Sequence, residues 1–357
     1  MSPAHFSANS IKSHGSLLPR DVLAKIQFDA DFEGMDNASF QLENDVRTQD
    51  AITEAWTQCQ ELWRTFRTDK QLLEAGDPGT ELTREHWLVP MLKVLGFDPE
   101  FVSSIDVEST THPASHISGG TALHLLGCGI PLNKKSSGIP GASKMGPHST
   151  LQQFLNRSDE HLWGIVSNGM ALHILRDTVS LTRQAYVEFD LESMFNGAIF
   201  SDFRLLYKIC HSSRFEGTPQ SECLLERWIV NAREDGIRAM DQLRDGVESA
   251  LCQLGTGFIV HPKNGVLRES IASGNLDATE IYRHLMRIVY RFLFLFTAED
   301  RDVLLLSNTP PHQRERFEKY YSTGRLRELA DRPTSPGHSD LWDGFLALAS
   351  VFNKSGG

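Results

Sequence analysis

One stretch of the chain, Leu162–Asp190, constrains the fold most, because it encodes a β-hairpin followed by a third strand. Asn168-Gly169 lies between two short apolar runs and is the dipeptide that most readily supplies two residues with positive φ. Residues 185–190 then alternate with the period of two that is typical of a half-buried strand. The sequence therefore predicts three consecutive strands of one sheet, and its two hairpin runs are Trp163–Ser167 and Met170–Leu175.

A second feature is an acid-free segment just before this hairpin. No Asp or Glu occurs from Ser109 to Ser158, although the chain of 357 residues has a formal net charge of −11. A locally positive, Gly- and Ser-rich segment on an acidic protein favours a polyanion partner. Compact cations on such a loop would contact phosphates without reading bases. We therefore predict a DNA-binding set that consists of Lys134, Lys135, Lys144, His148 and Arg157, with a solvated loop as the alternative.

Other polar residues near the hairpin have simpler interpretations. Arg176 and Arg183 flank it and can either reach the same surface or pair with Asp177 or Glu188. The five cysteines are scattered and form no CxxC pair, which favours buried small side chains over disulfides or zinc ligands.

The bulk composition is that of an ordinary globular protein. Hydrophobic residues make up 40% and charged residues 23% of a chain long enough for two or three domains. No apolar run is long enough to span a bilayer, and the first thirty residues lack the apolar core of a signal peptide. These features predict a cytoplasmic protein with no membrane partner.

The pattern along the chain predicts three regions. Residues 1–48 form an N-terminal arm with one short helix near Pro19. Residues 49–192 form an α/β domain with a mixed sheet, in which a strand, the basic loop, a short helix and the hairpin follow one another. Residues 193–357 are wholly helical, and the strongest apolar stripe of the chain, in residues 281–296, predicts a helix at the centre of a bundle. The fold class is α/β plus α.

Tests for catalytic motifs are negative. The sequence contains no GxGxxG, GxxxxGK[ST], HExxH or GxSxG. It also lacks the Asp/Asn-Pro-Pro-Tyr/Phe tetrapeptide with which amino-methylating enzymes hold the target nitrogen. Asn308-Thr309-Pro310-Pro311 is only superficially similar, because its prolines are displaced and no aromatic residue follows.

The order of strand, loop, helix and hairpin resembles the restriction-endonuclease-like core. Such nucleases need an Asp on one strand and Glu-x-Lys or Asp-x-Lys on the next, because these carboxylates hold a divalent ion beside the scissile phosphate. The corresponding segment here has none, so we predict a degenerate fold without catalytic residues or metal ligands. The alternative is an active metal-dependent endonuclease that recruits Glu188 and Asp190.

Several longer segments resemble a known family. Residues 154–169, 175–177 and 180–192 are similar to the N-terminal region of large type IIG-like restriction-modification proteins. More narrowly, they resemble adenine-specific DNA methyltransferases of phage-defence systems such as DISARM and BREX. Residues 290–301 resemble the helix that precedes the methylase domain in those proteins, and Ser16–Pro19 and Trp87–Leu92 fit the same pattern.

This resemblance implies a non-catalytic DNA-engaging and scaffolding module of an adenine-specific DNA methyltransferase. The implied partners are duplex DNA and either other defence-system subunits or a C-terminal methyltransferase domain that would begin after Gly357. S-adenosylmethionine would belong to that domain, and no cofactor is expected in this chain. A pure protein-interaction scaffold is a further alternative.

Overall fold

The computed structural model describes residues 8–43, 46–107, 110–112, 114–177, 184–306, 308–330 and 340–354. Contacts divide the chain into two units, Met1–Gly236 and Ile237–Gly357. The boundary lies within the long helix α8, Leu224–Val260. The strands of the first unit are β1 (Ile11–His14), β2 (Glu100–Phe101), β3 (Ile105–Val107), β4 (Thr110–His112), β5 (His116–Ser118), β6 (Thr121–Leu125), β7 (Trp163–Ser167), β8 (Ala171–Arg176) and β9 (Tyr186–Asp190).

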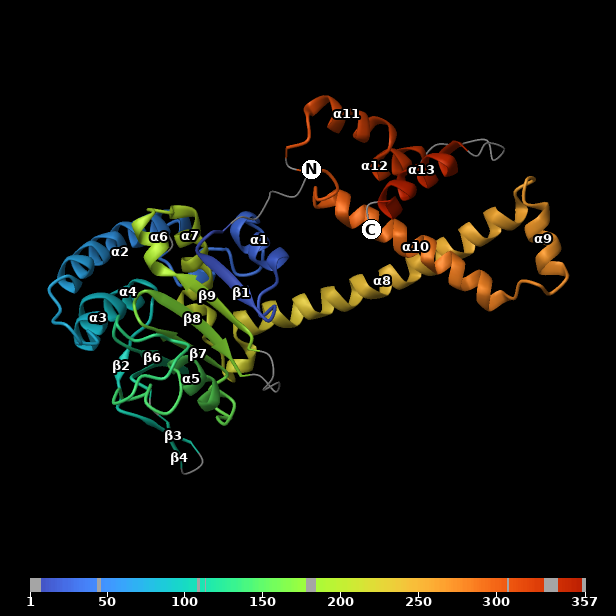
Figure 1. The fold of residues 1–357 in the computed structure, drawn as a ribbon. Coiled ribbons are helices and arrows are strands. Elements are labelled where there is room, and N and C mark those ends of the chain that lie inside the picture. Colours follow the sequence, from blue (N-terminus) through green and yellow to red (C-terminus); the bar gives the residue numbers. More distant parts are fainter. Residues whose placement is uncertain are drawn as a thin grey trace. The chain divides into compact units, whose positions relative to one another are not determined.

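The first unit is built around a mixed sheet, as the sequence predicts. Its described strands follow the order β1-β9-β8-β7-β6-β5-β2, and β3 pairs with β4 in a separate ribbon (Figure 1). Among the described strands of this sheet, only β6 and β7 pair in parallel, and the crossover between them contains the predicted basic loop and a helix. The helices of the unit before α8 are α1 (Arg20–Phe28), α2 (Thr48–Lys70), α3 (Thr80–Thr83), α4 (Val89–Val94), α5 (Pro147–Leu155), α6 (Leu191–Asn196) and α7 (Phe200–Cys210).

The predicted hairpin forms, but its turn differs from the expectation. Only Gly169 has positive φ, at 80°, whereas Asn168 does not. The Asn168 side chain stabilises the turn instead, because its Oδ1 accepts hydrogen bonds from the backbone N–H groups of Met170 at 3.0 Å and Ala171 at 2.9 Å. Asparagine thus acts through its side-chain oxygen rather than through its tolerance of a left-handed backbone.

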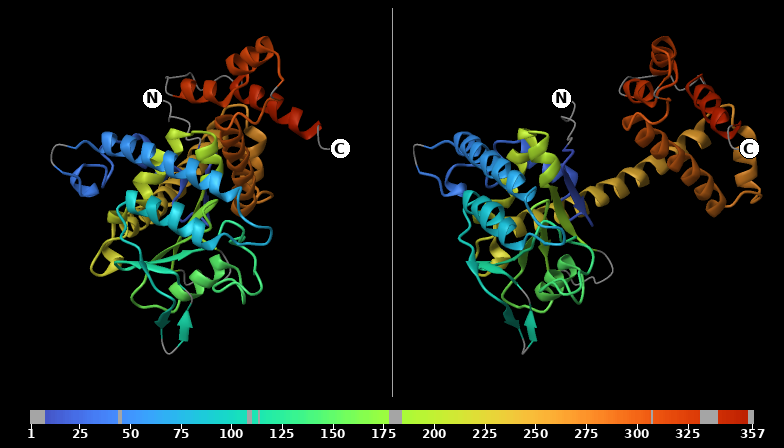
Figure 2. Two further views of the ribbon diagram at one scale, coloured as in Figure 1. Left: turned by 90° about the vertical axis from the view of Figure 1, so that its left-hand side faces the viewer. Right: turned by 60° about the vertical axis from the view of Figure 1, so that its left-hand side comes forward.

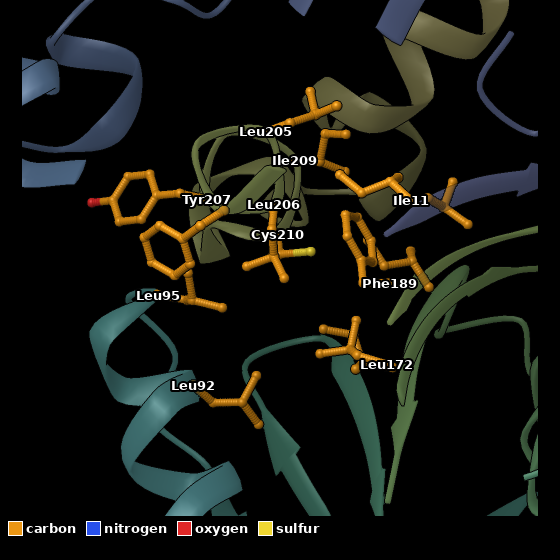
Figure 3. Close-up of a cluster of buried hydrophobic side chains, with 14 of the residues drawn as sticks. Ile11, Leu92, Leu95, Leu172, Phe189, Leu205, Leu206, Tyr207, Ile209 and Cys210 are labelled. Carbon is orange, nitrogen blue, oxygen red and sulfur yellow. The ribbon is translucent and has the colours of Figure 1, made fainter. Parts of the chain in front are cut away.

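The two faces of the sheet carry different layers of helices. One face packs against α5, and the other packs against α2, α4, α6 and α7 (Figures 1 and 2). Strand alternation sorts the side chains, since Val187 and Phe189 belong to the second face and Tyr186 to the first. Burial of each large apolar side chain there contributes about 1.5–3 kcal/mol. Figure 3 shows part of this core, with Ile11, Leu92, Leu95, Leu172, Phe189, Leu205, Leu206, Ile209 and Cys210 packed together.

The N-terminal region is more than the arm that the sequence predicts. The short helix begins after Pro19 as expected, but β1 pairs with β9 as the edge strand of the sheet. The following loop is held by Arg214, whose guanidinium is buried, donates to the carbonyls of Gly34 and Ser39, and lies 3.7 Å from the centre of the Phe40 ring. This burial lowers the pKa of Arg214 to about 10.

The helical part of the chain is divided differently from the sequence-based boundary at residue 192. Helices α6 and α7 belong to the first unit, because their apolar faces complete its core. In the described part of the second unit all regular elements are helices, and α10 is less buried than its apolar stripe predicts: only Val289, Leu295 and Ala298 are buried. Besides the end of α8, these helices are α9 (Gly265–Ala272), α10 (Ala278–Asp300), α11 (Pro311–Tyr320), α12 (Thr323–Ala330) and α13 (Asp340–Lys354). Among the described helices, none is both long and apolar enough to cross a bilayer.

Candidate nucleic-acid interface

The basic loop between β6 and α5 folds back on itself and is held by hydrogen bonds and buried side chains. Apolar side chains of Ile130, Leu132 and Ala142 are buried beneath it in the core on the α5 face of the sheet. Its backbone is closed by a hydrogen bond from the N–H of Ser136 to the carbonyl of Ala142 at 2.7 Å. The amide of Asn168 in the hairpin turn donates to the carbonyl of Ile130 at 2.8 Å. The loop is therefore anchored to the turn of the β7–β8 hairpin.

The loop gathers three of the predicted phosphate-binding cations. Lys134, Lys135 and Lys144 are all exposed. Two parts of the loop approach closely, since a Cβ atom on Gly146 would lie 2.9 Å from the backbone N of Lys134. This contact and the Ser136–Ala142 hydrogen bond bring together the backbone segments that carry the three lysines. The loop itself contains no acidic residue.

Arg157 is exposed but lies at the other end of α5. The helix between them has nine residues and is about 14 Å long at 1.5 Å per residue. Asp159 and Glu160 follow Arg157 closely in the sequence and are also exposed. The structure therefore places Arg157 apart from the three lysines, in less positive surroundings.

His148 requires a correction, because its side chain is buried and not on the surface with the lysines. It lies in the first turn of α5 with an exposed fraction of 1%. Its Nδ1 lies 3.1 Å from Nδ1 of His173 on β8, and its backbone N–H donates to the carbonyl of Leu132. His148 thus connects the start of α5 to both the sheet and the loop, and it presents no surface to a phosphate.

The two histidines belong to a polar cluster that the sequence analysis did not identify. Nε2 of His173 lies 3.7 Å from the Glu188 carboxylate, and Nε2 of His14 lies 3.4 Å from the same oxygen. The Tyr186 ring stacks on His14 with 4.3 Å between the ring centroids. Burial lowers the pKa of His148 to about 4 and that of His173 to about 3, so both rings are neutral at pH 7. The available signal was that His173 and Glu188 fall on the same face of neighbouring strands.

Arg176 also differs from expectation. Its ion pair is with Glu226 at the start of α8, which it contacts through two N–H groups, and not with the carboxylate of Asp177 or Glu188. The two N–O distances are 2.6 and 2.7 Å, and the Glu226 residue is 7% exposed. This bond raises the pKa of Arg176. The Nη1 of Arg176 also donates to the backbone carbonyl of Asp177 at 2.7 Å. Arg183 lies outside the described residues.

The carboxylates considered for a nuclease site have other partners. Asp190 caps α6, accepting hydrogen bonds from the backbone N–H of Ser193 at 2.9 Å and from its hydroxyl at 2.7 Å. Glu188 faces His14 and His173, as described above. Across the described ranges, no three His, Cys, Asp or Glu residues lie so that they could hold a metal ion. Strands β5 and β6, the hairpin before the crossover, carry no carboxylate. These residues do not fit the divalent ion that a nuclease requires.

No protein-family model, no curated protein and no solved structure matches this chain.

Proposed function

We propose that the first unit is a DNA-engaging and scaffolding module with a degenerate restriction-endonuclease-like fold. In this proposal, the lysine loop contacts the phosphate backbone of duplex DNA, and the chain performs no chemistry on it. The module would serve an adenine-specific DNA methyltransferase of a restriction-modification or phage-defence system. The observation that carries the proposal is the closed, exposed loop with Lys134, Lys135 and Lys144 on an otherwise acidic chain.

The order of elements supports the nuclease-like ancestry. In the sheet, β2, β5 and β6 are neighbouring antiparallel strands, α5 lies in the crossover, and β7 then pairs in parallel with β6. In a nuclease of this type, two neighbouring strands would supply an Asp and a Glu-x-Lys. Here β6 presents Ala122 and His124 at alternate positions, and His124 Nε2 lies 3.1 Å from the carbonyl of Gly141 in the basic loop. A histidine that is buried and faces the loop occupies this part of the sheet.

The loop is anchored to the fold, and this supports a role in binding better than a freely moving loop would. A loop held by buried side chains and backbone hydrogen bonds loses little conformational freedom on binding, so more of its electrostatic attraction is expressed as affinity. Because lysine ammonium groups are compact charges, they suit phosphate contact without base recognition. The proposal therefore predicts binding that depends strongly on salt and weakly on sequence.

The test is a measurement of duplex DNA affinity against salt concentration, with the full chain. Replacement of Lys134, Lys135 and Lys144 by Ala is expected to reduce the slope of log K against log[salt] by about 3, since each phosphate contact contributes about 0.9. The matched control removes three exposed cations from other surfaces of the same unit, Arg20, Arg64 and Lys93, and leaves the slope within about 1 of the original.

Three results would contradict the proposal. An equal reduction of the salt slope in the lysine variant and in the control variant would show that DNA binding depends only on the net charge of the chain. Absence of any binding at low salt would favour a pure protein-interaction scaffold. Cleavage of DNA with Mg²⁺ or Mn²⁺ that is abolished by Glu188→Ala would establish the endonuclease alternative.

A further inference from the structure

The second unit contains a large apolar groove that its own described side chains leave open. Its volume is about 940 Å³, and its walls come from α8, α10, α12 and α13. The C-terminal part of the predicted α10 stripe, Val289, Phe292, Leu293 and Phe296, lines this groove, and of these four residues only Val289 is buried. The principal wall residues are Leu254, Phe258, Phe292, Phe296, Trp342 and Phe345.

Small residues of α8 form an open part of this groove. Gly246, Ala250 and Gly257 line it, and a Cβ atom added to either glycine would meet nothing within 4 Å. The lining residues of α8 from Leu243 to Phe258 extend over about 22 Å of helix. The groove is therefore elongated, and the missing side chains of the glycines contribute to its size.

The charged residues that line the groove are all cationic. Among the described residues that line it, Lys263 and Arg327 are cationic and none is acidic. The Arg327 guanidinium lies 4.8 Å from the centre of the Phe296 ring and pairs with Asp300 at 3.1 Å. A guanidinium has five N–H donors, so this pairing leaves donors for a second anion. Lys263 is exposed.

We propose that this groove binds an elongated apolar molecule with one anionic head group, of the class of long-chain carboxylates. The apolar walls remove the chain from water, and Arg327 or Lys263 receives the carboxylate. Ligand pockets in proteins typically have volumes of about 300–1,000 Å³ and apolar walls with a few placed polar groups, and this groove fits that description. The proposal is independent of the DNA-binding role of the first unit.

Calorimetric titration of the full chain with decanoate, laurate and myristate, below the concentrations at which micelles form, tests the proposal. We expect one saturable site whose affinity rises about fifteenfold for each two added methylene groups. Dodecanol, which lacks the charge, should bind at least tenfold more weakly than laurate. Arg327→Gln together with Lys263→Gln should remove this difference between laurate and dodecanol while leaving the binding of dodecanol unchanged.

Glycine variants locate the site. Gly246→Leu and Gly257→Leu each place a side chain in the open space of the groove. Leucine also favours the helix more than glycine does. Each variant should weaken laurate binding at least tenfold. Gly236→Leu is the matched control, because it lies in α8, also meets nothing within 4 Å and does not line the groove. Circular dichroism verifies that all three variants are folded.

Two outcomes would overturn the proposal. Laurate binding that is absent, or equally affected by all three glycine variants, would exclude a site in this groove. The second outcome is a chain that binds no laurate but forms a concentration-dependent dimer, which Gly246→Leu dissociates. This result would assign the groove to a contact between two copies of the chain. Sedimentation velocity of the wild type and of this variant distinguishes the second outcome.

Discussion

His148 on α5 and His173 on β8 face each other with their Nδ1 atoms 3.1 Å apart. Both side chains are buried, so one ring must donate the single proton that lies between them and the other must accept it. Protonation of the accepting Nδ1 would set two N–H groups against each other and place a positive charge in a buried site. Burial therefore favours the neutral pair, which holds the start of the helix that follows the lysine loop.

The first prediction concerns acid stability. Burial lowers the pKa values of His148 and His173 to about 4 and 3, whereas the unfolded chain takes up protons below pH 6.5. The free energy of unfolding should therefore fall as the pH decreases from about 6.5 toward these values, by about 2 kcal/mol for each ring at pH 5. Urea unfolding at pH 7.5 and pH 5 measures this loss.

The control for acid stability is a pair of leucine variants. In the double variant His148→Leu and His173→Leu, the free energy of unfolding should no longer show the part of its pH dependence that these two rings cause. His312→Leu, at an exposed position, should retain the wild-type dependence. An unchanged pH dependence in the double variant would show that other groups cause the loss.

The second prediction concerns the buried ion pair of Arg176 and Glu226. Arg176→Met leaves the Glu226 carboxylate, in a residue only 7% exposed, without its cation and should reduce the free energy of unfolding by about 3 kcal/mol. Arg64→Met, which breaks an exposed pair with Glu61, should cost less than about 1 kcal/mol. Chemical denaturation compares the two, and equal costs would argue against a special role for the buried pair.

The third prediction concerns two glycines with nearly the same backbone conformation. Gly169 and Gly138 have φ values of 80° and 79°, so alanine strains both by about 1 kcal/mol. At Gly169 the new Cβ atom would also lie 2.7 Å from Thr83 Cγ2, while at Gly138 it would meet nothing within 4 Å. Gly169→Ala should therefore lower the melting temperature clearly more than Gly138→Ala. Similar shifts would mean that the hairpin turn moves freely away from Thr83.

The fourth prediction separates Arg157 from the lysine loop. Because Arg157 follows the C-terminal end of α5 and the lysine loop precedes its N-terminal end, Arg157→Ala should change the salt slope of DNA binding by at most about 1. Affinity should remain sensitive to Lys134→Ala in this background. If Arg157→Ala reduced the slope as much as the triple lysine variant, the DNA contact would have to be centred on the end of α5.

The sequence alone predicted the local parts of the structure well. The hairpin, the strand of residues 185–190 and most helices follow from side-chain period and turn chemistry, which act over a few residues. The mixed sheet and the exposure of Lys134, Lys135 and Lys144 also agree with the sequence-based interpretation. Whether these lysines bind DNA remains a prediction.

Tertiary structure decided the features that join distant parts of the chain. The pairing of β1 with β9, the burial of His148 against His173 and the partner of Arg176 each depend on which surfaces meet in the folded core. A histidine or arginine has the same local pattern whether it points to solvent or into a core. Its surroundings are determined by packing between segments far apart in sequence, and no short-range period encodes that packing.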